Sequence, residues 1–266
     1  MGKSIVEEEV KKMSQAVKTY EGWFAYHDFR KIDWNKWKSI SPSGRQEIIL
    51  ELLDAIAEFS SVENNNEGSF GQYAILGHKA DLLFLHLRPN IDELNDIKTK
   101  FNKLGFAGIT SNPYSYLSVV ELSSYTIDPD TDPLSDPAFR ERLQPILPKT
   151  QYTCFYPMNK RRLGEDNWYR ISVDERKKMM KSHGVIGRSY SGKVRQIITG
   201  SIGLDDWEWG VSLFSDDPLY FKKLITEMRF DEVSARFGEF GSFYVGCRLT
   251  NEMLSSMLND KTPDIR

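Results

Sequence analysis

The segments GWFAYHDFRK (residues 22–31) and TCFYPMNKRR (residues 153–162) decide the fold, because they are two versions of one pattern. Both read as β-strands, in which successive side chains point to opposite faces. Aligning them brings together two pairs of residues, Tyr26 with Tyr156 and Arg30 with Lys160. The first half of the chain therefore has a counterpart in the second half.

A second likeness supports this duplication. GHKADLLFLHLRPNIDELNDI (residues 77–97) resembles GLDDWEWGVSLFSDDPLYFKKL (residues 203–224), again at corresponding places in the two halves. Repeated similarity of this kind indicates an internal repeat of one structural unit.

The apolar periodicity of the first half predicts alternating strands and helices after the opening strand. A helix at residues 41–61 has Ser43 as its predicted N-cap, and a helix at residues 90–106 has Asn90. The predicted strands are residues 72–76, 80–88 and 114–125. The order β-α-β-β-α-β is that of a ferredoxin-like unit.

The second half repeats this order. A strand at residues 151–158 precedes a helix at 172–183, which opens with the capping box Ser172–Glu175. A hairpin within 194–214, a helix at 217–230 and a strand at 241–249 follow. We predict an α+β fold in which duplicated ferredoxin-like units form an α+β barrel, with the helices outside.

These elements suggest a simple domain organisation. Residues 1–127 form the N-terminal half and residues 151–257 the C-terminal half, and residues 258–266 are expected to be a flexible tail. The proline-rich residues 128–150 read as a surface connector with one short helical turn at 138–143, because prolines at these intervals exclude a long regular element.

Composition excludes several classes of protein. The 266 residues carry a formal net charge of -3, which implies no general affinity for nucleic acid. No run approaches the ~18 apolar residues that cross a bilayer, and the N-terminus lacks a signal core, so we expect a cytoplasmic protein. Cys154 and Cys247 are predicted to be buried free thiols.

The C-terminal strand carries the first candidate site. Tyr156, Met158 and Lys160 alternate along it and would share one face. Pro157 lacks a backbone donor, which favours an edge or a bulge at that position. Taken alone, this pentapeptide also fits an amphipathic strand whose lysine extends to solvent.

His183 is the second candidate. His27, His78 and His86 lie among apolar neighbours or at a turn of the first half, whereas His183 ends a predicted helix directly before Gly184. It could be a cation stabilised by the helix dipole, or a lone axial ligand of haem iron. A set of basic residues could surround an anionic ligand: Arg140, Arg142, Lys160, Arg161, Arg188, Arg195 and Arg229.

Longer motifs join these candidates. YPMNKRR (residues 156–162), the WY at 168–169, the run from MMKSHGVIGRSYSGK to GLDDWEWGVSLF (179–214) and RFDEVSARFGEFGSFYVG (229–246) closely resemble the coproheme decarboxylases. These are the chlorite-dismutase-like enzymes that end the coproporphyrin-dependent route to haem b. The resemblance covers essentially the whole chain apart from the first few residues and about the last eight.

The resemblance implies roles for individual residues. His183 matches the proximal iron ligand, Tyr156 the tyrosine that forms a radical, and Lys160 the lysine needed for the second decarboxylation. Gln196 stands where a true chlorite dismutase has a distal arginine, which argues against chlorite turnover. The remaining matches are propionate contacts, namely Met158, Arg142, Arg229 and Ser234.

The implied reaction is the hydrogen-peroxide-dependent oxidative decarboxylation of two propionates of Fe-coproporphyrin III (coproheme), which is both substrate and redox cofactor. Haem b would form through a monovinyl tripropionate intermediate. The resemblance also implies a ring-shaped homopentamer, with the upstream ferrochelatase as a transient partner. The alternatives are a general haem peroxidase or chlorite-degrading relative, a non-catalytic haem-binding or haem-delivery protein, and a purely structural barrel.

Overall fold

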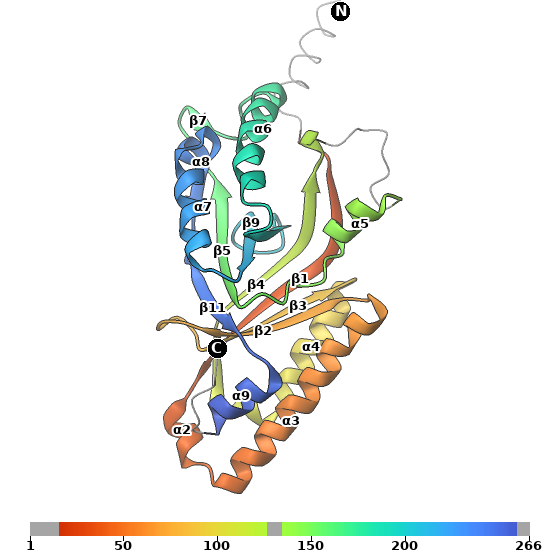
Figure 1. Cartoon of the computed structure of the whole chain (residues 1–266), viewed down its shortest axis with the longest axis vertical. Helices are drawn as coiled ribbons and strands as arrows, with labels where there is room; N and C mark the ends of the chain where they lie inside the picture. Colours follow the sequence, from red (N-terminus) through yellow and green to blue (C-terminus); the bar gives the residue numbers. More distant parts are fainter. Residues whose placement is uncertain (1–15, 127–134, 260–266) are drawn as a thin grey trace, which may run out of the picture.

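The computed structural model describes residues 16–126 and 135–259 of the chain. The described residues form a mixed α+β fold around one large antiparallel sheet, with the helices on its outer side (Figure 1). The predicted fold class is thus confirmed. No helix within the described ranges is long and apolar enough to cross a membrane.

The described part of the N-terminal half supplies four strands and three α-helices. The strands are β1 (Thr19–Ile32), β2 (Ser69–Ile75), β3 (Leu82–Arg88) and β4 (Thr110–Ser123). The helices are α2 (Trp34–Ser39), α3 (Pro42–Ser61) and α4 (Ile91–Lys103). Short 3-10 helices occupy Val62–Asn65, Gly105–Ile109 and Ser124–Thr126.

The C-terminal half follows α5 (Pro137–Leu143) of the connector. Its main strands are β5 (Tyr152–Lys160), β8 (Arg195–Gly200), β9 (Trp209–Ser215) and β11 (Tyr244–Arg248). Shorter strands are β6 (Arg162–Leu163), β7 (Asp166–Asn167) and β10 (Gly238–Phe240). The helices are α6 (Val173–Ser189), α7 (Leu219–Phe230), α8 (Glu232–Phe237) and α9 (Asn251–Leu258).

The two halves pair their strands in the same way. In the first half β1 pairs with β3 and β4 while β2 pairs with β3, and in the second half β5 pairs with β9 and β11 while β8 pairs with β9. The halves join through β11–β2 and β4–β8. Because β5 also pairs with β9, the eight main strands close into a ring.

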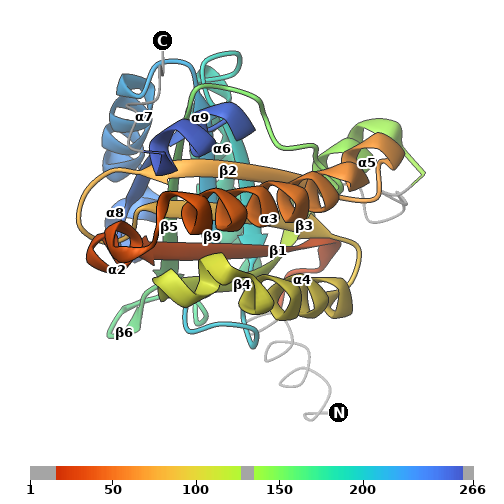
Figure 2. The same ribbon diagram turned by 90° about the horizontal axis from the view of Figure 1, so that it is seen from below.

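Alternation along β1 divides the apolar residues between the inside and the outside of this ring. On the inner face, Trp23 and Phe29 join Phe155 and Tyr244 of the other half in a shared interior cluster. The opposite face packs beneath α3, α4 and α9, which lie side by side across the sheet in Figure 2. The outer face of the first half is thus covered by its own α3 and α4 together with α9 from the second half.

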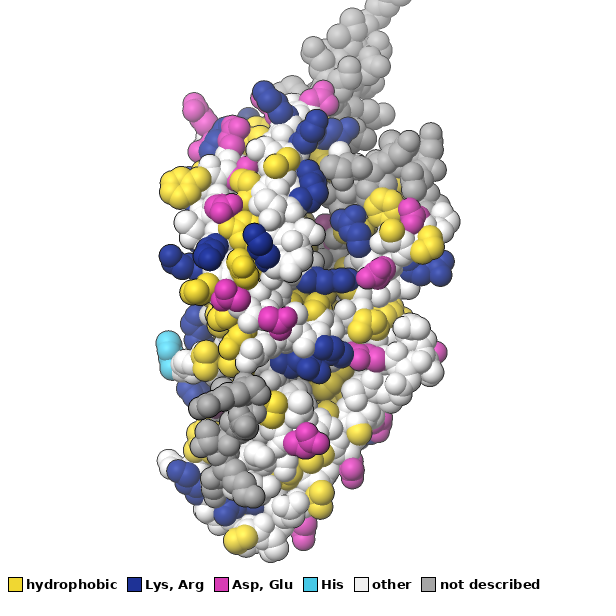
Figure 3. All heavy atoms as spheres, in the orientation of Figure 1, with side chains coloured by type: hydrophobic (Ala, Val, Ile, Leu, Met, Phe, Trp, Pro, Cys, Tyr) yellow, Lys and Arg dark blue, Asp and Glu magenta, His cyan; other side chains and the backbone are white. Residues whose placement is uncertain are grey.

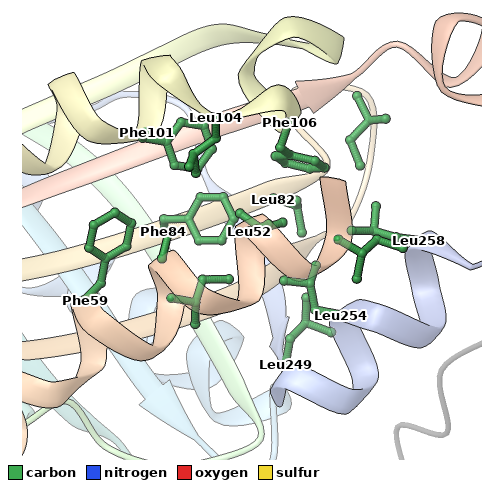
Figure 4. Close-up of a cluster of buried hydrophobic side chains, with 14 of the residues drawn as sticks. Leu52, Phe59, Leu82, Phe84, Phe101, Leu104, Phe106, Leu249, Leu254 and Leu258 are labelled. Carbon is green, nitrogen blue, oxygen red and sulfur yellow. The ribbon is translucent and has the colours of Figure 1, made fainter. Parts of the chain in front are cut away.

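Beneath the helices of the first half, a cluster of buried apolar side chains packs against the outer face of the sheet (Figure 4). Leu52 and Phe59 of α3 meet Phe84 of β3 and Phe101 of α4. α9 adds Leu254 and Leu258 from the far end of the chain, and the Trp37 indole N–H donates to the Leu258 carbonyl oxygen at 2.9 Å. Leu258 thus belongs to α9 rather than to a tail, while residues 260–266 lie outside the described ranges.

Most predicted elements are present, with local corrections at their ends. The cap of α3 is Ser41, whose hydroxyl accepts from the Gly44 N–H, and not Ser43. The Asn90 cap and the Ser172–Glu175 capping box are confirmed. Cys154 and Cys247 are buried free thiols as predicted.

The connector does form a short helix, α5, but it does not lie wholly on the surface. Leu143 and Leu147 are buried, and the Leu147 N–H donates to the Ser69 hydroxyl at 2.9 Å. Apolar side chains at these positions fasten the described part of the connector onto the first half of the sheet.

Candidate active site

A cavity of about 650 Å³ lies between the outer face of the C-terminal half of the sheet and helices α6, α7 and α8. It extends to the ends of β1 and β4, and its volume is within the ~300–1,000 Å³ of typical ligand sites. Most of the sequence-predicted residues line it, namely Arg142, Tyr156, Met158, Lys160, His183, Gln196 and Ser234.

β5 positions three of these residues by simple alternation. Tyr156, Met158 and Lys160 all line the cavity, whereas Phe155 points into the ring interior, so the predicted shared face is confirmed. Pro157 is not at an edge, because it pairs with Gly210 of β9. On the other side of β5, β11 pairs with residues up to Phe155 and β10 pairs with residues from Met158 onward. Pro157, which has no N–H to donate, therefore lies between these two partner strands.

Tyr156 is a buried phenol, 6% exposed. Its ring lies against Phe243 and Phe240, with centroid separations of 4.6 Å and 5.7 Å. Burial raises the pKa of Tyr156, as does neighbouring Cys154, while Arg229 opposes them. The hydroxyl therefore stays protonated at neutral pH, and oxidation of this residue must remove a proton together with the electron.

Lys160 is a buried cation. It is 8% exposed, and its ammonium lies 5.1 Å from the centroid of the Trp168 ring. Burial lowers the pKa of Lys160 to about 8, while Asp231 and Glu208 work in the opposite direction. An amine with this pKa can both carry a charge and release a proton near neutral pH.

His183 lies within α6 and not at its end, so the predicted helix boundary is wrong. Gly184 and Gly187 weaken a helix but do not stop it, and the chain leaves helical geometry only after Ser189, before Gly192 at φ +76°. The reading of His183 as a cation at a helix terminus is therefore excluded. Its side chain faces the cavity instead.

A carboxylate fixes the His183 ring. The Nδ1 atom lies 2.9 Å from Oδ2 of Asp231, whose side chain is only 2% exposed. Burial lowers the pKa of His183, and the hydrogen bond to Asp231 partly offsets this. With Nδ1 held as a donor, Nε2 is the nitrogen available to a ligand, which is the arrangement typical of metal-binding histidines.

Asp231 is a site residue that sequence reasoning missed. It caps α8 by accepting a hydrogen bond from the Val233 N–H at 3.2 Å, in addition to holding His183. The only local signal is an acidic residue directly before a short helix, which indicates a cap and says nothing about a histidine 48 residues earlier.

The sheet wall opposite α6 carries Gln196, Ile198 and Gly200 of β8. Glu121 of β4 lines the same wall, and burial raises its pKa. A Cβ on Gly200 would collide with the Glu121 carboxylate, so this glycine makes room for it. Gln196 and His183 thus come from opposite walls of one cavity.

The predicted cationic and polar contacts do not all reach the cavity. Arg142 of α5 lines it, and burial lowers the pKa of this guanidinium. Ser234 of α8 is buried at the same cavity. Arg229 does not line it: its guanidinium stacks on the Phe240 ring, 3.8 Å from the ring centroid, and only its charge reaches Tyr156.

Further basic residues surround the site. Arg176 of α6 is buried at the cavity wall, and it was not distinguished by the sequence. Lysine and arginine side chains are also frequent over the upper half of the surface, around α6 and α7 (Figure 3). The exposed cations of these two helices are Lys177, Lys178, Lys181, Arg188, Lys222, Lys223 and Arg229.

Comparison with known proteins agrees with this geometry. The family model described as chlorite dismutase matches residues 45–249, which is most of the chain. The chain belongs to the chlorite dismutase family. A heme-binding protein from Thermus thermophilus is 48% identical, with a TM-score of 0.88 over 92% of this chain and 98% of that one.

More distant members of the chlorite dismutase family share the fold. A variant of the chlorite dismutase from Candidatus Nitrospira defluvii superposes with a TM-score of 0.73 at 14% identity, covering 95% of this chain and all of that one. The same enzyme in complex with imidazole gives 0.71 at 15% identity over 95% of this chain. At such identities the likeness concerns the fold alone.

Proposed function

We propose that this member of the family is a coproheme decarboxylase. The observation that carries the proposal is the convergence of Tyr156, Lys160 and His183 on one cavity, with the imidazole on one wall and the phenol and amine on the other. A protein that only stores a porphyrin needs the imidazole but has no use for a buried redox phenol.

The donor set fits an iron porphyrin better than a free metal ion. Within residues 16–126 and 135–259, no group of three or more His, Cys, Asp or Glu side chains could hold a metal. A single imidazole oriented by a carboxylate supplies one axial bond, which is what a porphyrin iron requires. Lys160, Arg142 and Arg176 offer the cavity cations that propionates would need.

The bound iron would supply the oxidising power that hydrogen peroxide provides. Each turnover would convert one propionate, hydrogen peroxide and a proton into a vinyl group, carbon dioxide and two water molecules. Tyr156 would lose its hydroxyl hydrogen atom and, as a phenoxyl radical, take a hydrogen atom from the propionate β-carbon. Loss of a second electron and of the carboxylate as carbon dioxide leaves the vinyl group.

Lys160 would serve the second propionate. Alternate residues of a strand are roughly 6.5–7 Å apart, so Tyr156, Met158 and Lys160 follow one edge of a porphyrin-sized ligand. The Lys160 ammonium can neutralise a carboxylate or deliver a proton, because its pKa of about 8 makes the proton exchangeable. His183, held by Asp231, would fix the iron on the other wall.

The decisive experiment uses a matched pair of variants. Tyr156→Phe should bind iron coproporphyrin III like the wild type but make no vinyl product with hydrogen peroxide, followed by mass spectrometry. Tyr26→Phe, its counterpart in the first half, should convert normally because Tyr26 packs against the filled apolar cluster. Normal conversion by the Tyr156 variant would refute the assigned role.

A non-catalytic haem-binding protein is the second candidate, supported by the 48% identity to the heme-binding protein from Thermus thermophilus. Such a protein would bind haem b at least as tightly as coproheme and would leave coproheme unchanged in the presence of peroxide. Light scattering of the purified chain would test the expected homopentamer independently of either activity.

A further inference from the structure

Glu208 is a buried carboxylate beside the cavity that the proposed chemistry does not use. It is 7% exposed and stands directly before β9, on the turn from β8. Its Oε2 accepts a hydrogen bond from the backbone N–H of Lys160 at 2.8 Å. Its Oε1 lies 3.6 Å from Nη1 of Arg162. One side chain thus contacts the residues on both sides of the end of β5.

The backbone of Glu208 is fixed to the same region. Its N–H donates to Oδ1 of Asn159 at 2.9 Å, and its carbonyl oxygen accepts from the Ser201 N–H at 2.9 Å. Glu208 therefore joins the end of β5 to the turn between β8 and β9. Because both its backbone and its side chain are held, the carboxylate has a defined position.

The end of β5 is also the start of a short hairpin. Residues 161–170 contain β6 and β7, and the hairpin closes through the Trp168 N–H, which donates to the Arg161 carbonyl oxygen at 3.0 Å. Trp168 and Tyr169, which follow β7 at the C-terminal end of this segment, both line the cavity. Burial raises the pKa of the Tyr169 phenol, and neighbouring Glu208 raises it further.

We propose that Glu208 is a positioning residue, which holds Lys160 and the hairpin of residues 161–170 against the cavity. Its carboxylate fixes the backbone from which the Lys160 side chain starts, and Arg162 carries that fixation into the hairpin. The hairpin then presents Trp168 to the Lys160 ammonium. That Glu208 holds the hairpin in place does not depend on the proposed function, whereas its effect on catalysis does.

The charge of Glu208 matters as well as its hydrogen bond. Three titratable groups influence the Lys160 ammonium: Glu208 on the turn before β9, Asp231 at the N-cap of α8, and His183 of α6. Asp231 is already engaged with His183, so Glu208 is the carboxylate whose charge is directed to β5 and the hairpin. Replacing Glu208 with Gln keeps an acceptor oxygen for the Lys160 N–H, while it removes the charge and puts an amide NH2 in place of the oxygen that faces Arg162.

The mechanical role can be tested on the protein without ligand by limited trypsin digestion. The hairpin contains cleavage sites after Arg161, Arg162 and Arg170. We expect Glu208→Ala to be cut there about tenfold faster than the wild type, because a buried hydrogen bond and an ion pair are lost. Glu208→Gln should be cut at an intermediate rate and Asp206→Ala, a change at an exposed neighbour, at the wild-type rate. Equal rates for Glu208→Ala and the wild type would overturn the proposal.

The catalytic effect needs a second measurement, made with iron coproporphyrin III and hydrogen peroxide. Removing a negative charge that favours the protonated amine should move the high-pH limit of the second decarboxylation down by about one pH unit in Glu208→Gln. The first decarboxylation should keep its pH profile, so that the monovinyl intermediate accumulates above about pH 7. Equal shifts in both steps, or none, would refute the electrostatic role. If neither the wild type nor the variants convert the porphyrin, the proposed function fails while the digestion result still stands.

Discussion

The buried ammonium of Lys160 should lower the free energy of unfolding of the protein. The pKa of this amine lies near 8 rather than at its ordinary 10.5, and each pH unit of difference corresponds to about 1.4 kcal/mol. At pH 7 the folded protein therefore holds a buried ammonium at a cost of about 3 kcal/mol relative to the unfolded chain. Lys160→Met fills the same space without a charge. Allowing about 1 kcal/mol for the lost contact with Trp168, we expect the variant to be about 2 kcal/mol more stable.

The sign of the pH dependence makes this prediction specific. A lowered lysine pKa means that the unfolded chain binds more protons between pH 8 and 10.5, so the stability of the wild type rises across that window. The advantage of Lys160→Met should fall to about half near pH 9 and vanish near pH 10. Urea unfolding at several pH values measures it, with Lys103→Met on exposed α4 as a control that should change little. A variant less stable than the wild type at pH 7 would show that the ammonium is not a burden to the fold.

Three further predictions concern other parts of the molecule. Gly200→Ala should cost about 1–3 kcal/mol in urea unfolding because the new methyl group meets the Glu121 carboxylate, whereas Gly108→Ala, which has open space, should not. Trp37→Phe should cost about 1–2 kcal/mol by leaving the Leu258 carbonyl unpaired; a stability equal to the wild type would show that this bond does not hold α9. Reversing Lys177 and Lys181 to Glu should slow coproheme association about tenfold at low salt, measured by stopped flow, with little effect in ~1 M salt. Reversal of Lys98 and Lys103 on α4 is the matched control, and an equal slowing there would remove the argument for local steering.

The sequence could predict those features of the site that depend on local periodicity. Tyr156, Met158 and Lys160 share a face because a strand alternates, whatever else surrounds it. The end of α6 could not be predicted in the same way, because glycine after His183 is compatible with both a helix stop and a helix interior. Packing of Ile186, which lies beyond His183, against a buried apolar cluster favours the longer helix.

Residues that act through tertiary contacts were not accessible to sequence reasoning. Asp231 reaches His183, and Glu208 reaches the Lys160 N–H, across 48 positions of sequence in each case. Neither carboxylate stands in a pattern that distinguishes it from an ordinary cap or turn residue. Arg229 is the opposite case, because the resemblance predicted it to contact a propionate, but it stacks on Phe240 and does not line the cavity.

The asymmetry between the two halves follows from the strands on which the fold was recognised. In the first half Arg30 stands where Lys160 does, but Asp28 stands where Met158 does, and the two form a buried pair with hydrogen bonds of 2.7 Å and 2.8 Å. The Arg30 guanidinium also lies 4.3 Å from the centroid of the Phe101 ring. Its charge is therefore neutralised by Asp28, and its face is covered by an aromatic ring of the same half.

In the second half no carboxylate occupies the position of Asp28. Met158 cannot neutralise Lys160, and the apolar clusters beneath α6 and α7 leave the cavity open beside them. A buried ammonium with only partial compensation is costly to the folded protein, and an anionic ligand is what would relieve that cost. The same scaffold thus closes one outer face with an internal ion pair and leaves the other to be completed by a ligand that carries carboxylates.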